Sequence, residues 1–233
     1  MRYIGVDLSL NHTGLAIVDD NGSILVTHEI KVDTKKSTWA RIIETIQGLS
    51  IFIEGENEMS IEDVYFGLNA KGAKDALRLS GALMYHYYLR CKKEPILLYA
   101  TSARKLVGLS PTCLKTDVQI FIMQRFNICS ELRLKVYKKS VNIIKEGADK
   151  LLTPLIKEYK EIKKKKEKIL TCSSNQQLKE IKEKIELVKK EYKKAMLKIS
   201  KEIEDEFDLS EHKADAIVLA LAIKRYHESL KEL

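Results

Sequence analysis

The sequence has no run of 18 apolar residues, and its four cysteines form no C-x-x-C pair. Without a long apolar run the chain has no candidate transmembrane helix, so we expect no membrane partner. Unpaired cysteines argue against a zinc-binding motif of that type, and free thiols are typical of a reducing compartment. The amino-terminal residues pass directly into a strand pattern, with no apolar signal-peptide core. These absences predict a cytoplasmic protein.

An excess of positive charge is also missing from most of the chain. Residues 131–206 contain 22 Lys/Arg and 14 Asp/Glu, a net charge of +8, whereas the other 157 residues contain 19 of each. Because all the excess charge lies in one segment, that segment is a candidate for binding phosphate backbones. A solvated helix surface would explain the same charges, and the sequence leaves both interpretations open.

Hydrophobic periodicity predicts an α/β fold. Strand patterns occupy 2–7, 14–19, 23–31, 50–54 and 95–99, and Asn21-Gly22 favours a tight hairpin between the second and third. Helix patterns occupy 37–48, 61–90, 101–107, 115–127 and 210–230. Three antiparallel strands followed by alternating strands and helices predict a mixed five-stranded sheet with helices on both faces.

Residues 131–206 show a different pattern, with only Gly147 and Pro154 as helix breakers. Apolar residues alternate at spacings of three and four on both sides of a polar turn at 171–177. The positions are Leu134, Tyr137, Val141, Ile144, Ala148, Leu151 and Leu155, then Leu178, Ile181, Ile185, Val188, Tyr192, Ala195 and Ile199. We therefore predict an antiparallel coiled-coil hairpin with arms of roughly 45–60 Å. It would be inserted into a domain made of 1–130 and 207–233, with Pro154 kinking the first arm.

Three acidic residues stand where core residues are expected. Asp7 ends the first strand, Glu54 ends the predicted strand at 50–54, and Asp215 lies in the apolar helix pattern near the carboxyl terminus. A buried carboxylate needs a partner, and Mg²⁺ accepts such oxygen ligands. Two such ions can stabilise the attacking and leaving oxygens of a phosphodiester. His212 precedes Asp215 by three positions and shares its helix face, so we predict that it joins these acids.

Each of these residues also has a simpler explanation. Asp7 could cap a turn in a segment rich in local hydrogen-bonding residues. Glu54 could lie at the surface, as its acidic neighbours do. His212 could be an ordinary residue of a helix amino terminus beside the N-cap Ser210. The metal-site hypothesis depends on their occurring together.

These segments resemble the RuvC Holliday-junction resolvases, which have an RNase H-like fold. "IGVDLSLNHTGLAI" is similar to the first motif of the family, and "IFIEGEN" with the helix pattern after it is similar to the second. "PILLYATSARKLVGLSPTCLKTDV" resembles the basic segment, and "HKADAIVLALAI" resembles the last acidic helix. The resemblance covers about 1–127 and 207–230, in the order of the family. The hairpin departs from the usual family pattern.

The resemblance implies a homodimer that resolves four-way or branched DNA by paired symmetric nicks. It implies two Mg²⁺ ions per active site, with Mn²⁺ as a substitute. The implied ligands are Asp7, Glu54, Asp215 and His212, of which His212 is either a ligand or a proton-transfer group. Lys115 matches a catalytic lysine near the scissile phosphate. The residues expected to contact DNA are Tyr65 or Phe66, by stacking on a junction base, and Arg104, Lys105, Lys115, Lys163, Lys164, Lys165 and Lys166, by charge.

The resemblance also implies the cytoplasm of a bacterium or of a phage-infected cell. Three other functions compete with junction resolution. One is RNA processing by a nuclease of the YqgF type, and another is non-catalytic binding of branched DNA with the hairpin as a scaffold. Actin-like ATPases begin with a similar strand, Asp and small-residue loop, but they need a second phosphate loop, which this chain does not show.

Overall fold

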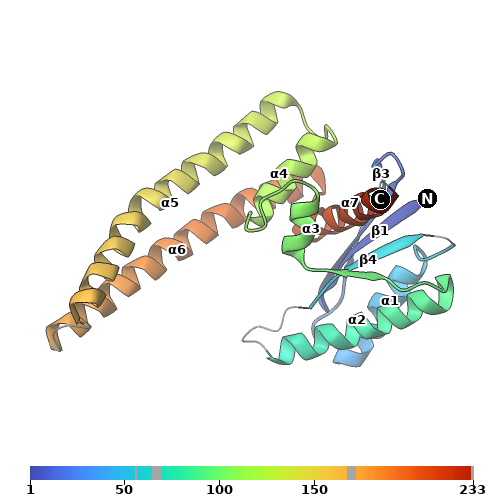
Figure 1. The fold of residues 1–233 in the computed structure, drawn as a ribbon, viewed down its shortest axis with the longest axis horizontal. Helices are drawn as coiled ribbons and strands as arrows, with labels where there is room; N and C mark the ends of the chain where they lie inside the picture. Colours follow the sequence, from blue (N-terminus) through green and yellow to red (C-terminus); the bar gives the residue numbers. More distant parts are fainter. Residues whose placement is uncertain (56, 65–69, 167–171, 232–233) are drawn as a thin grey trace. The chain divides into compact units, whose positions relative to one another are not determined.

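The computed structural model describes residues 1–55, 57–64, 70–166 and 172–231 (Figure 1). The chain divides into two compact units. The sheet unit consists of Met1–Phe126 and Asp208–Leu233, and the hairpin unit consists of Asn127–Phe207. The sequence-based boundaries of the insertion were 131 and 206.

The sheet unit contains a mixed five-stranded sheet, as predicted. Its strands are β1 (Arg2–Asp7), β2 (His12–Asp19), β3 (Ile24–Lys31), β4 (Glu58–Glu62) and β5 (Ile96–Leu98), in the order β3-β2-β1-β4-β5. β1, β2 and β3 form an antiparallel meander, with the turn at Asn21-Gly22 between β2 and β3. β4 is parallel to β1, and β5 is parallel to β4. The carboxyl ends of β1 and β4 therefore lie at the same edge of the sheet.

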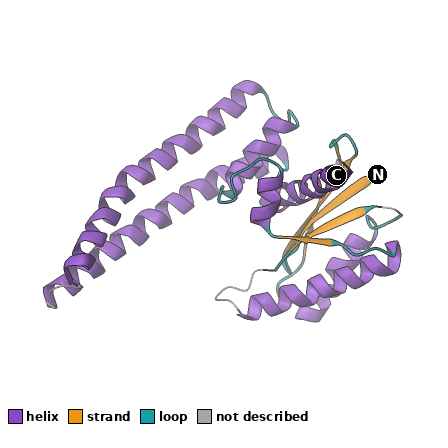
Figure 2. Ribbon diagram, in the orientation of Figure 1, coloured by secondary structure: helices purple, strands orange, loops and turns teal. Residues whose placement is uncertain are grey.

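Helices cover both faces of this sheet (Figures 1 and 2). The helices of this unit are α1 (Thr38–Ser50), α2 (Ala70–Cys91), α3 (Ala100–Leu106), α4 (Lys115–Arg125) and α7 (Glu211–Lys231), of which α3 and α4 pack against α7. α1 and α2 lie on one face, where Leu49, Leu83 and Tyr87 pack on the apolar residues of the central strands. α7 crosses the other face over β1 and β2.

Gly5 explains how closely α7 approaches the sheet. A Cβ atom at this position would lie 2.1 Å from the carbonyl oxygen of Ala216 and 2.4 Å from the backbone nitrogen of Ala220. Any larger residue in the middle of β1 would therefore push the helix away. Small residues on both surfaces let the α7 backbone lie directly against the central strand.

The predicted strand at 50–54 is wrong. α1 continues to Ser50, and the chain then turns through Gly55, whose φ is +66°. The strand was predicted because the run is apolar and ends at an acid, but the burial of Leu49 and Ile53, four positions apart, fits the end of a helix. The strand that pairs with β1 lies further along the chain, at Glu58–Glu62. Residues 61 and 62, predicted to begin a helix, therefore belong to β4.

The hairpin unit consists of two long helices, as predicted (Figure 1). They are α5 (Glu131–Lys166) and α6 (Cys172–Phe207), each of 36 residues. Arg133 pairs with Glu206 at 2.6 Å, and the hydroxyl of Tyr137 donates to the same carboxylate at 2.6 Å. These contacts join the first two turns of α5 to the last turn of α6, so the two ends of the insertion lie close together.

The seam between these helices differs from the predicted one at Leu151 of α5 and at Ala195 of α6, where Met196 is the buried residue. Tyr137, Val141 and Ala148 are buried as expected, but Leu151 is 58% exposed. The next inward-facing residue is Leu152, so the spacing includes two consecutive steps of four. An extra step of four shifts the seam around the helix, because 3.6 residues per turn do not match a strict heptad. Pro154 follows this shift, and α5 continues past it to Lys166.

Across the described residues, no helix combines the length and apolarity needed to span a membrane.

Candidate active site

The first two acids of the site come from neighbouring parallel strands. Asp7 is the last residue of β1, and Glu62 is the last residue of β4. The register pairs Val6 with Ile61, so the next position in each strand brings Asp7 beside Glu62. Side chains alternate along a strand, and both acids therefore point to the face that α7 covers. The two carboxyl groups share a hydrogen bond.

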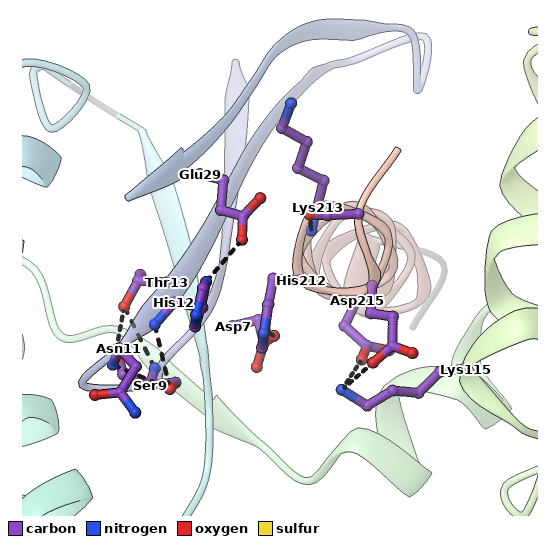
Figure 3. Close-up of polar contacts among 12 residues, drawn as sticks. Asp7, Ser9, Asn11, His12, Thr13, Glu29, Lys115, His212, Lys213 and Asp215 are labelled. Carbon is purple, nitrogen blue, oxygen red and sulfur yellow. Dashed lines mark hydrogen bonds and ion pairs between the residues drawn. The ribbon is translucent and has the colours of Figure 1, made fainter. Parts of the chain in front are cut away.

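The amino-terminal turn of α7 adds two more groups. The Ser210 hydroxyl accepts a hydrogen bond from the Lys213 backbone N–H at 3.2 Å and caps the helix. His212, in the first turn, places its Nδ1 atom 2.6 Å from Oδ2 of Asp7 (Figure 3). Asp215 lies three residues further on the same face and is 8% exposed. A β1 carboxylate and two α7 side chains thus meet over the sheet edge.

Two cations face these acids. Nζ of Lys115, the first residue of α4, lies 3.2 Å from Glu211 and 3.8 Å from Asp215. Arg104 of α3 donates from Nη2 to Asp215 at 3.2 Å and from Nη1 to the Cys113 carbonyl at 3.1 Å. The guanidinium is thereby fixed behind Asp215, whereas the Lys115 side chain is 46% exposed and can reach a ligand.

The carboxyl groups do not ionise alike. Burial, together with the hydrogen bond to Asp7 and the charge of Asp7, raises the pKa of Glu62 to about 9. Burial also raises the pKa of Asp215, and Asp7 adds to this while Arg104 and Lys115 oppose it. Burial opposes ionisation of Asp7 too, but hydrogen bonds with His212 and Glu62 outweigh it and lower its pKa. Asp7 is therefore the charged member of the pair, and Glu62 holds the proton.

The nitrogen bases respond in the opposite direction. The hydrogen bond with Asp7 raises the pKa of His212, against the effect of its partial burial. Burial works against the charge of Lys115, but Asp215, Glu211 and Asp7 together raise its pKa. The carboxylates around them therefore favour the cationic form of each group.

This arrangement fits a divalent cation. Asp7, Glu62 and Asp215 supply hard oxygen donors, the type that Mg²⁺ prefers. Two neighbouring carboxyl groups cannot both be ionised unless a cation neutralises their charges. The raised pKa of Glu62 reflects its burial and the negative charge of Asp7 beside it. A divalent ion would replace the proton.

Glu54, predicted as a ligand, does not lie with these groups. It precedes β4 and lies at the opposite end of the sheet, where it lines a shallow pocket with Met1 and Arg2. Its side chain is 72% exposed and lies 3.7 Å from Arg90. The error follows from the wrong strand at 50–54. The signal for Glu62 was present in "EMSIE", where Met59 and Ile61 alternate with polar residues and an acid ends the run.

The other predicted site residues have different surroundings. Tyr65 and Phe66 lie outside the described residues. Arg104 points inward to Asp215, with its side chain 13% exposed, whereas Lys105 is exposed. The tip lysines Lys163 and Lys164 are exposed on α5, and the side chains of Lys165 and Lys166 lie outside the description.

The family comparison agrees with this geometry. The family model described as crossover junction endodeoxyribonuclease RuvC matches residues 3–137, more than half of the chain. The chain belongs to the RuvC family. The matched RuvC region includes β1, β4, Asp7, Glu62 and Lys115. α7 lies beyond it, so the assignment of His212 and Asp215 to the same site depends on the structure.

A solved RuvC structure shares the fold. The structure titled "T. thermophilus RuvC in complex with Holliday junction substrate" has a TM-score of 0.50 and 11% identity, and the match covers 98% of this chain and 96% of that one. A second Thermus thermophilus RuvC structure has 16% identity over 55% of this chain and 81% of that chain, with a TM-score of 0.43, too low to support an argument. None of the curated proteins compared with the chain matches it.

Proposed function

We propose that this RuvC-family chain is a divalent-metal-dependent endonuclease that resolves four-way or branched DNA by paired symmetric nicks. The observation that carries the proposal is the meeting of Asp7, Glu62 and Asp215 from three distant segments beside a reachable lysine. Carboxylates so arranged are suited to phosphodiester hydrolysis. Family membership favours DNA junctions as the substrate.

The three carboxylates would hold the metal, with His212 as a further ligand or as a proton-transfer partner. Two Mg²⁺ ions, or Mn²⁺ in their place, would supply Lewis acidity toward the phosphate. Lys115 is placed to offset charge on the non-bridging oxygens as it develops. Arg104 holds Asp215 in position through its 3.2 Å contact, and His212 does the same for Asp7 through Nδ1.

We further propose that the active form is a homodimer. A four-way junction has two equivalent strands to cut, and twofold protein symmetry would place one site at each. The hairpin unit, in this proposal, binds the phosphates of a duplex arm. Its net charge is +8, and a helix of roughly 50 Å would span about 15 base pairs.

The test is cleavage of a mobile synthetic four-way junction, in Mg²⁺ and in EDTA. Two Glu→Gln variants form a matched pair. Glu62→Gln removes a carboxylate of the site, and Glu54→Gln removes an exposed carboxylate outside it. We expect Mg²⁺-dependent cleavage that Glu62→Gln lowers by about a hundredfold or more, corresponding to about 3 kcal/mol, with Glu54→Gln close to wild type. Equal activity of Glu62→Gln and wild type would refute the site.

A structured RNA in the same assay tests the competing function. Cleavage of the RNA with no cleavage of the junction would assign the chain to RNA processing. Binding of the junction with no cleavage in either metal would assign it to branched-DNA binding.

The role of His212 needs its own variants. If the imidazole is only a ligand, His212→Asp should retain substantial activity, because a carboxylate replaces it. If the imidazole transfers a proton, the same variant should lose most activity and its pH profile should lose a titration step. Wild-type rates in His212→Ala would remove the residue from the mechanism.

A further inference from the structure

Three potential metal ligands lie together next to the carboxylate site. They are His12 at the start of β2, Glu29 in β3 and His212 itself (Figure 3). One ligand atom from each lies within 4.8 Å of the others. The proposed nuclease function uses neither His12 nor Glu29.

The sheet register explains why these residues meet. β2 and β3 pair His12 with Lys31 and Gly14 with Glu29, so His12 and Glu29 are diagonal neighbours on one face. A Cβ atom on Gly14 would lie 2.1 Å from the carbonyl oxygen of His212, so the first turn of α7 lies directly on this glycine. The imidazoles of His12 and His212 are nearly parallel, at 6°, with centroids 5.6 Å apart.

The hydrogen bonds already orient two of the donors. Nδ1 of His212 contacts Asp7, so a neutral ring that donates there leaves the Nε2 lone pair for an ion. A carboxylate behind a ligating histidine is the usual support for histidine–metal bonds. Nδ1 of His12 lies 3.3 Å from Oε1 of Glu29, whose side chain is 8% exposed and has Lys31 at 3.5 Å as its other partner.

The donor types indicate which ion would bind. Two imidazole nitrogens and one carboxylate are a donor set typical of Zn²⁺ and other nitrogen-binding transition metals. Mg²⁺ prefers a set made of oxygen atoms alone, as Asp7, Glu62 and Asp215 provide. The two groups of side chains therefore differ in the ions they select, although they are adjacent.

We propose that His12, Glu29 and His212 form a second metal site, selective for a nitrogen-binding divalent ion such as Zn²⁺. Small shifts of the side chains close the donor separations to coordination distance. Because His212 also contacts Asp7, an ion here fixes the histidine that positions the catalytic carboxylate. The proposal depends on the placement of three side chains and not on nuclease activity.

Zinc binding by the full chain tests this site. After EDTA treatment and removal of the chelator, Zn²⁺ is titrated in excess Mg²⁺ against a chromophoric chelator, and Co²⁺ absorption reports the coordination. We expect His12→Ala and Glu29→Gln each to weaken Zn²⁺ binding about tenfold or more and to diminish the Co²⁺ bands. His28→Ala is the matched control, because His28 is on β3 but packs against Phe52 on the opposite face of the sheet. It should bind Zn²⁺ as the wild type does.

Unchanged Zn²⁺ affinity in both His12→Ala and Glu29→Gln would overturn the proposal. The proposal would also be overturned if Glu62→Gln lost Zn²⁺ binding while His12→Ala and Glu29→Gln kept it. The ion would then bind among the carboxylates. Melting curves confirm that the variants are folded. Junction cleavage is scored separately, so active protein without this zinc site refutes only the zinc site, and inactive protein with it refutes only the nuclease proposal.

Discussion

The sheet unit and the hairpin unit bury their apolar residues by different means. In the sheet unit, β1 packs against α7, more than 200 positions later in the chain. In the hairpin unit, α5 and α6 pack mainly on each other. Their charges differ as well, because the whole net charge of +8 lies in the hairpin segment. The proposed function therefore assigns chemistry to the sheet unit and duplex binding to the hairpin unit, and it predicts that the two can be removed separately.

The largest expected effect comes from removing a site carboxylate while leaving the hairpin intact. Asp7→Asn should lower junction cleavage in Mg²⁺ by about a hundredfold or more, since the loss of metal stabilisation amounts to several kcal/mol. Junction affinity should be nearly unchanged, because the proposed function places most phosphate contacts on other residues. Cleavage and electrophoretic binding assays on one preparation measure both. Wild-type cleavage by Asp7→Asn would contradict the assignment of catalysis to the carboxylates of the sheet unit.

The reverse change removes the hairpin and leaves the carboxylates. Replacing 131–206 with a short Gly/Ser linker should weaken junction binding and flatten its salt dependence. Each phosphate contact contributes about −0.9 to the slope of log K against log salt, so loss of about five contacts changes the slope by about 4.5. Binding titrations at several salt concentrations measure it. An unchanged slope with a shift from dimer to monomer in sedimentation would assign the hairpin to assembly instead.

A smaller effect should appear in the pH dependence of stability without metal. The pKa of Glu62 is raised from 4.5 to about 9, so folding retains a proton that the unfolded chain releases. Its stabilising contribution is complete below pH 4.5 and declines as pH rises toward 9. In EDTA, the melting temperature of the wild type should therefore fall more between pH 6 and pH 8.5 than that of Glu62→Gln. Parallel curves would contradict the shared-proton pair.

The smallest effect concerns the seam of the hairpin. Leu152 faces inward and Leu151 is 58% exposed, so adjacent leucines form a matched pair. Leu152→Ala should destabilise the hairpin by about 1–3 kcal/mol, whereas Leu151→Ala should change stability by less than about 0.5 kcal/mol. Urea unfolding followed by circular dichroism compares them. A larger loss of stability in Leu151→Ala than in Leu152→Ala would instead support the strict heptad seam.

The sequence predicted those features that depend on local pattern. The antiparallel meander followed from alternating residues and the Asn21-Gly22 turn, and both long helices followed from spacings of three and four. Asp7 was proposed because it ends an apolar strand pattern and His212 because it shares a helix face with Asp215, and the structure places Nδ1 of His212 2.6 Å from Asp7.

The errors concern features that local pattern does not determine. Leu49 and Ile53 produce an apolar run that fits either a helix end or a strand, and only pairing with β1 shows that the strand lies at 58–62. The assignment of Glu54 in place of Glu62 followed from that choice. The meeting of His12 and Glu29 with His212 had no sequence signal, because it depends on the contact between α7 and Gly14.

The close ends of the insertion have a consequence for synthesis on the ribosome. The first strands emerge long before α7, so Gly5 and the residues around it lack their cover while the hairpin is being translated. A helical hairpin forms quickly from local contacts. Once the hairpin has formed, its Arg133–Glu206 contact holds the two ends of the 81-residue insertion together. The nascent chain would then have a short loop to close rather than a long one when α7 arrives, which lowers the entropy cost of completing the domain.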